Sequence, residues 1–108
     1  MNAPTAHPLA DAVRCLPALR RDAVPDAGRP FIGLARRLGV FEEGCEREAI
    51  DRLSENDRRA LLFFRRHLPV EVIQWLCGDE AMAQVASPEY VAFSCLYFAA
   101  EHLHATLP

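Results

Sequence analysis

The chain has 108 residues, of which about half are apolar and a quarter charged, and its formal net charge is −3. This length fits one domain, and the composition is that of a folded protein rather than a disordered one. The mildly negative charge argues against a general nucleic-acid binder and against an acidic mimic of nucleic acid. Every basic side chain is an arginine, because the sequence contains no lysine.

The beginning of the chain and its cysteines indicate the compartment. Residues 1–8 predict a flexible tail without the basic and apolar regions of a signal peptide, and residues 9–108 predict one helical domain. The longest uncharged run, residues 90–100, is too short to span a membrane. The four cysteines lie 18 to 32 residues apart without C-x-x-C spacing, as expected of reduced thiols. We therefore expect a cytoplasmic protein.

Apolar spacing predicts the helices of the first half. Leu9 to Leu16 predicts a short helix, and residues 24–30 predict a loop because they contain two prolines and a glycine. The next helix follows from apolar residues at positions i, i+3, i+4 and i+7, which are Phe31, Leu34, Ala35 and Leu38. Gly39 is its natural stop, and Glu42 to Leu53 predicts a further helix.

Capping residues divide the second half with greater clarity. Ser54 begins one helix through a motif similar to a capping box, the Leu68-Pro69 step ends it and begins the next, and Cys77-Gly78 ends that one. Asp79 to Val85 predicts one or two turns, and Ser87-Pro88 begins the last helix, residues 89–105. That helix is apolar nearly all round, so it must be largely buried. The fold class is all-α, a compact bundle of five to six short helices.

Part of this pattern is similar to a known family. The Leu68-Pro69 step with Trp75 six residues after the proline, the arginine-rich helix Leu61 to Leu68, and the Phe31 to Gly39 segment resemble an uncharacterised all-helical proteobacterial family. Some members of that family are encoded near secretion systems. The resemblance covers residues 30–77 and implies no catalytic residue. The chain departs from the family at position 76, where Leu76 stands in place of a second tryptophan.

The helix that begins at Ser54 carries a stripe of arginines. At 100° per residue, Arg58, Arg59, Arg65 and Arg66 fall within a sector of about 120°, with Leu62 among them. The opposite side holds Ala60, Leu61, Phe63, Phe64 and Leu68. An apolar side chain among arginines is typical of a contact centre, although a solvated face with i,i+4 ion pairs explains the same pattern. On the next helix, Trp75 lies beside Glu71 and either closes the core edge or anchors a partner.

Other chemistries receive less support from the sequence. Cys95 and His102 share a face of the last helix, so a small metal- or thiol-dependent enzyme is one alternative, but close ligand pairs typical of zinc sites are absent. A nucleic-acid binder is a second alternative, but no aromatic platform interleaves the arginines. No catalytic motif is recognisable, so we predict no catalytic residue, no metal and no cofactor.

The expected function is therefore non-enzymatic binding of another protein, as a bacterial or phage accessory, adaptor or inhibitor protein. The partner would bind Arg58, Arg59, Leu62, Arg65, Arg66, Glu71 and Trp75. We also expect a possible homodimer through the heptad-spaced edge of the last helix, which consists of Tyr90, Tyr97 and His104.

Overall fold

A computed structural model describes residues 18–77 and 87–107 of the chain. These residues form two 3₁₀ segments, η1 (Arg21–Ala23) and η2 (Asp26–Phe31), and five α-helices. The helices are α2 (Ile32–Leu38), α3 (Glu46–Asp51), α4 (Glu55–Arg66), α5 (Val70–Cys77) and α7 (Pro88–Ala105). The all-α prediction is confirmed. The predicted tail over 1–8, the helix over 9–16 and the turns over 79–85 lie outside the described residues.

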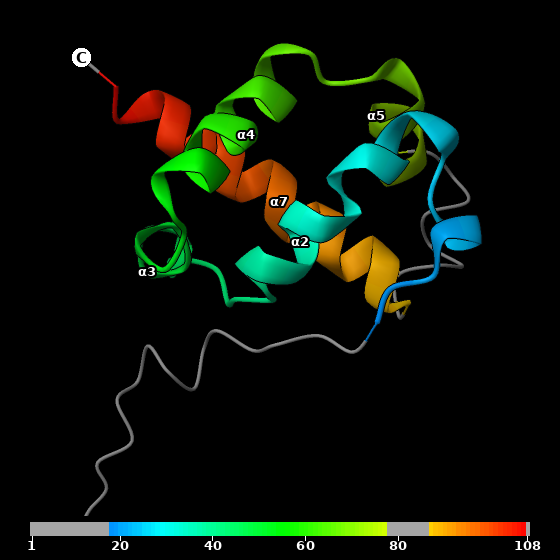
Figure 1. Cartoon of the computed structure of the whole chain (residues 1–108), viewed down its shortest axis with the longest axis horizontal. Helices are drawn as coiled ribbons and strands as arrows, with labels where there is room; N and C mark the ends of the chain where they lie inside the picture. Colours follow the sequence, from blue (N-terminus) through cyan, green and yellow to red (C-terminus); the bar gives the residue numbers. More distant parts are fainter. Residues whose placement is uncertain (1–17, 78–86, 108) are drawn as a thin grey trace, which may run out of the picture.

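Helix α7 is the element around which the others pack. It runs diagonally behind α2 and α4 in Figure 1, with α3 and α5 towards the two sides, and its most extensive contacts are with α4, α3 and α2. Its inner face combines small and large apolar residues with almost no exposure, which are Ala92, Phe93, Leu96, Ala99 and Ala100. The alanines let neighbouring helices approach closely, and burying each large side chain contributes about 1.5–3 kcal/mol.

The predicted capping residues begin two of these helices. Ser54 Oγ accepts a hydrogen bond of 3.1 Å from the backbone N–H of Asp57, and Ser87 Oγ accepts one of 3.1 Å from that of Tyr90. Each hydroxyl satisfies a donor that the first turn of a helix leaves unpaired. Pro88 follows Ser87 in the first turn of α7, where a missing N–H costs nothing.

Two predicted boundaries are wrong. The expected loop over residues 24–30 is largely the 3₁₀ segment η2, which contains Pro30 and continues directly into α2. The helix expected from Glu42 to Leu53 extends only over α3, because Gly44 adopts a φ of 92° that ends any regular helix before it. Residues 42–45 are therefore a turn that leads into α3.

A buried carboxylate joins the start of α7 to the N-terminal segment. Glu89 is 2% exposed, and its Oε2 accepts a hydrogen bond of 2.9 Å from the backbone N–H of Arg20. The guanidinium of Arg20 lies 4.0 Å from the other carboxylate oxygen. The first turn of a helix favours negative charge, so Glu89 is stabilised by α7 itself and by the chain that crosses its end.

Candidate functional site

The first turn of α4 is fixed by a side chain from α2. Asp57 stands at the position where a capping box would return a carboxylate to the backbone. Instead, its two oxygens accept hydrogen bonds of 2.9 and 3.0 Å from Arg37. Such a two-point arginine–carboxylate pair fixes direction as well as distance. Helix α4 is therefore locked against α2, and its outer side is presented at a defined angle.

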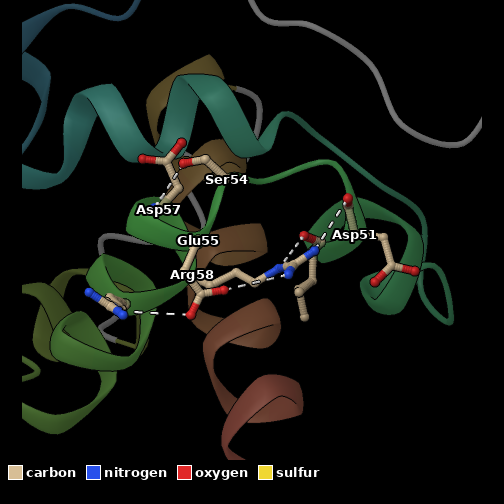
Figure 2. Close-up of polar contacts among 7 residues, drawn as sticks. Asp51, Ser54, Glu55, Asp57 and Arg58 are labelled. Carbon is tan, nitrogen blue, oxygen red and sulfur yellow. Dashed lines mark hydrogen bonds and ion pairs between the residues drawn. The ribbon is translucent and has the colours of Figure 1, made fainter.

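The guanidinium of Arg58 is engaged in contacts within the chain. Figure 2 shows its guanidinium reaching the end of α3, where it donates to the backbone carbonyls of Ile50 and Asp51, each at 3.4 Å. It also lies 3.9 Å from Glu55, which pairs with Arg59 at 3.8 Å. Carbonyls at the C-terminal end of a helix lack internal partners, and a cation there is favourable. Arg58 thus caps α3.

Arg65 is also directed inward. Its side chain is half-buried and its Nε lies 3.3 Å from a carboxylate oxygen of Glu101 on α7. The contact joins the C-terminal part of α4 to the C-terminal part of α7. Two of the four arginines that the sequence grouped together therefore hold neighbouring helices, and the predicted stripe is divided.

The outward part of α4 consists of four residues that we call the α4 surface: Arg59, Leu62, Phe63 and Arg66. Arg59 and Arg66 are exposed and Leu62 is half-buried. Phe63, which helical spacing placed on the side opposite the arginines, has a side chain that is 55% exposed. Its ring lies 4.4 Å from that of His67 and 6.3 Å from that of Phe31, between ring centroids. An aromatic side chain thus stands beside two outward cations.

Trp75 does not lie near Arg65. Its ring packs edge-on against Tyr90 and Phe93, at centroid distances of 5.8 and 5.7 Å, and it lines a hollow with residues of η1 and η2. These contacts are near the start of α7, whereas Arg65 meets Glu101, roughly 16 Å further along the helix. Glu71 is exposed on α5. Trp75 closes one edge of the core, as the alternative interpretation of its sequence position expected.

The predicted self-association edge on α7 is only partly outward. Tyr90 is half-buried, and its hydroxyl donates a hydrogen bond of 3.0 Å to the carbonyl of Leu76. Tyr97 is also half-buried, while His104 is exposed. The most outward large side chain of α7 is Phe98, which is 58% exposed and packs edge-on against Tyr97. The positions of the alanines already mark the opposite face as the inner one, and this signal could have found Phe98.

Two hollows flank Phe98, and we call them together the α7 groove. The first, of about 570 Å³, extends towards Phe41, Glu43 and Glu46. The second, of about 210 Å³, extends towards Ile73, Leu76 and Cys77 at the end of α5. The two hollows have three lining residues of α7 in common, which are Tyr90, Ser94 and Phe98. The α7 groove is therefore largely apolar, with two carboxylates at one rim.

Cys95 and His102 both line the first hollow, as their shared helix face predicted. Cys95 is buried and its thiol donates a weak hydrogen bond of 3.7 Å to the carbonyl of Phe41. Burial raises the pKa of the Cys95 thiol, so the neutral form is favoured over the nucleophilic thiolate. Among the described residues, no three His, Cys, Asp or Glu side chains gather to hold a metal ion. The arrangement favours a packing role for Cys95.

Comparison with known proteins gives no family to which the chain can be assigned. No family model, curated protein or solved structure matches it. The resemblance of residues 30–77 to a proteobacterial family stays a prediction. In the described part of the chain, no helix is long and apolar enough to cross a membrane.

Proposed function

We propose that this domain is a non-enzymatic module that binds another protein through the α4 surface. The observation that carries the proposal is Phe63, which is 55% exposed on a helix that Arg37 and Arg58 fix in place. Protein interfaces are enriched in aromatic residues, phenylalanine included, and in arginine, and a rigid helix presents them with little loss of entropy. The role is that of an accessory, adaptor or inhibitor.

The charges of the α4 surface support a protein partner rather than nucleic acid. Arg58 and Arg65 are engaged with α3 and Glu101, and Arg59 shares Glu55. In the described residues, Arg66 is the cation of this stripe that forms no ion pair. Nucleic-acid binding draws most of its affinity from many phosphate contacts, and this stripe offers too few. A carboxylate-bearing partner that packs on Leu62 and Phe63 suits the surface better.

The enzyme alternative has weaker support. It requires Cys95 and His102 to act together in the first hollow, where both lie. A raised thiol pKa opposes that chemistry, because a nucleophilic or metal-binding cysteine needs the thiolate. The protein-binding proposal requires no such group.

The test compares two phenylalanines of nearly equal exposure on different helices. Tagged wild-type protein, Phe63→Glu and Phe98→Glu are expressed in cells that naturally contain the protein, and bound proteins are identified by cross-linking and mass spectrometry. A partner that wild type and Phe98→Glu retain is then purified and titrated. We expect Phe63→Glu to weaken its binding by about 30-fold or more, which corresponds to a hot-spot residue. Equal binding by Phe63→Glu would contradict the proposal.

A second variant separates the cations from the aromatic ring. Arg59→Glu together with Arg66→Glu reverses the two outward charges and leaves Arg58 and Arg65 in their internal contacts. With the purified partner, we expect slower association and a weaker dependence of affinity on salt. An unchanged salt dependence would remove these arginines from the interface.

A further inference from the structure

The first described residues of the chain lie beside one end of the α7 groove. The backbone N–H of Arg20 donates a hydrogen bond of 2.9 Å to Glu89, and Leu19 is buried. The residue after Glu89 is Tyr90, which lines both hollows of the groove. Residues 17–19 extend over at most about 11 Å, so the chain before them is tethered close to this end of α7.

The length and the apolar pattern of the preceding segment match the groove. Residues 9–16 lie outside the described residues, and the sequence predicts a short helix for them. Their large apolar side chains share one side of that helix: Leu9, Val13 and Leu16. Eight residues of helix are about 12 Å long, which is also the length of α7 between Tyr90 and Phe98. A helix this short needs an apolar surface to pack on, and the groove offers one of the right length.

We propose that residues 9–16 form a helix that packs antiparallel to α7 in the α7 groove and covers Phe98. The direction follows from the tether, which holds Leu16 at the Tyr90 end and so places Leu9 over Phe98. The face on which a second copy was expected is then occupied by the chain itself. The proposal does not involve the α4 surface, so the two proposals can fail separately.

The charges of the segment and the groove match in this orientation. At 100° per residue, Arg14 lies about 130° to one side of the apolar stripe of residues 9–16, while Asp11 lies opposite the stripe. In an antiparallel pair of right-handed helices, Arg14 falls on the side of the first hollow, whose lining includes Glu43 and Glu46. A parallel segment would place it over the second hollow, which has an uncharged lining. Opposite charges beside an apolar contact thus favour the antiparallel direction.

The test is hydrogen exchange of the full chain, followed by mass spectrometry of peptides from residues 9–16. We expect wild type to slow exchange of these amides about fivefold, because a short docked helix opens readily. Phe98→Glu places a carboxylate in the apolar contact and should remove this protection. Phe63→Glu on α4 is the matched control and should retain it. Peptides from α7 should exchange alike in all three proteins, which establishes that the fold is kept.

Three outcomes of this comparison would overturn the proposal. The first is exchange of residues 9–16 in wild type at the rate of an unstructured chain. The second is protection that survives Phe98→Glu, and the third is protection that is lost in Phe63→Glu as well. In the last two cases the segment would contact another part of the molecule.

A charge exchange at low salt tests the direction of the segment. Arg14→Glu should lower the protection by about twofold, and the addition of Glu43→Arg should restore it. Glu43 suits the exchange because Glu46 already accepts a hydrogen bond of 2.9 Å from the backbone N–H of Gly44. Unchanged protection in Arg14→Glu, or no recovery in the double variant, would overturn the antiparallel direction.

A second copy of the chain is the competing occupant of the groove. Protection by a second copy rises with protein concentration, whereas protection within one chain does not. The exchange of wild type is therefore measured at about 1 µM and about 100 µM. Equal protection at the two concentrations supports the proposal, and protection found only at the higher one overturns it.

Discussion

The two faces of α7 have similar hydrophobicity but differ in what they contact. The inner face alternates alanine with large side chains, and Phe93 is completely buried in it. The outer face has Ser94 in place of alanine, and Phe98 is 58% exposed. Phe93 and Phe98 are separated by only five positions, and their opposite environments arise from the direction of each side chain on the helix. Hydrophobicity alone therefore does not distinguish the two faces. The alanines do, because small side chains mark the face on which the neighbouring helices pack.

The largest expected change in stability comes from replacing a phenylalanine on each face of α7 by alanine. Phe93→Ala should lower the free energy of unfolding by about 3–5 kcal/mol, because a filled core position becomes a cavity. Phe98→Ala should lower it by less than about 1 kcal/mol, because the ring is 58% exposed. Urea unfolding followed by circular dichroism gives both values. Similar losses for the two variants would show that Phe98 is also a core residue.

The two carboxylates of α7 allow a similar comparison between a buried and a partly exposed charged side chain. Glu89→Ala should cost about 1–3 kcal/mol, because the backbone N–H of Arg20 loses a buried acceptor. Glu101→Ala removes a partly exposed ion pair with Arg65, and its cost should stay below about 1 kcal/mol. Thermal and urea unfolding at neutral pH measure the difference. A Glu101→Ala loss as large as that of Glu89→Ala would contradict it.

A pair of glycines tests how tightly the inner face is packed. A Cβ at Gly28 would lie 3.0 Å from side-chain atoms of Val24 and Val72 and 3.3 Å from the ring of Phe93, so Gly28→Ala should cost about 1–3 kcal/mol. At Gly33, which is exposed, a Cβ would lie 3.2 Å from Nη1 of Arg37, so the guanidinium would have to shift by a few tenths of an ångström while Nε and Nη2 keep their bonds to Asp57. The gain in helix propensity, up to about 1 kcal/mol, offsets the cost of that small shift, so Gly33→Ala should change the stability by less than Gly28→Ala does. Denaturation midpoints distinguish these outcomes.

The smallest expected effect concerns the cysteines. Burial raises the pKa of the Cys95 thiol in the folded protein, so the unfolded chain loses this proton at a lower pH than the folded chain does. The stabilisation is fully present below the ordinary thiol pKa of about 8.5 and is lost as the pH rises beyond it. Comparing urea midpoints of wild type and Cys95→Ala between neutral and alkaline pH isolates this contribution. An unchanged difference across that range would contradict it.

The difference in burial between Cys77 and Cys95 can also be measured directly, through the accessibility of their thiols. Cys77 is exposed at the end of α5, whereas Cys95 is buried against Phe41. An alkylating reagent should therefore modify Cys77 first, and Cys95 only as the protein opens. Mass mapping of the modified peptides over time checks the order. Rapid modification of Cys95 would indicate that the first hollow reaches its sulfur.

Local signals predicted the helix ends, and tertiary contacts decided the rest. Ser54, the Leu68-Pro69 step and Ser87-Pro88 act through their own backbone, so the sequence was sufficient to place them. Proline and glycine also suggested a loop over residues 24–30, but those residues are equally compatible with the 3₁₀ geometry found there.

The candidate surfaces were harder to predict than the helices. Helical spacing grouped Arg58 and Arg65 with two outward arginines, but it contains no information on the carbonyls of α3 or on Glu101, which occupy them. Similarly, Phe63 lies at the border of the apolar side of α4, and helical spacing alone does not show that it is 55% exposed. Single-helix geometry therefore identifies candidates, and only the packed fold assigns their directions.

The position of α7 in the chain has a consequence for how the protein is made. Helices α2 to α5 precede α7 in the sequence, yet α2, α3, α4 and α5 all pack on it (Figure 1). During synthesis, which proceeds at roughly 5–20 residues per second, the earlier helices emerge before their common neighbour exists. A nascent chain that ends before Pro88 exposes the apolar sides of four helices at once. The packing of the four earlier helices can therefore be completed only when α7 is available to them.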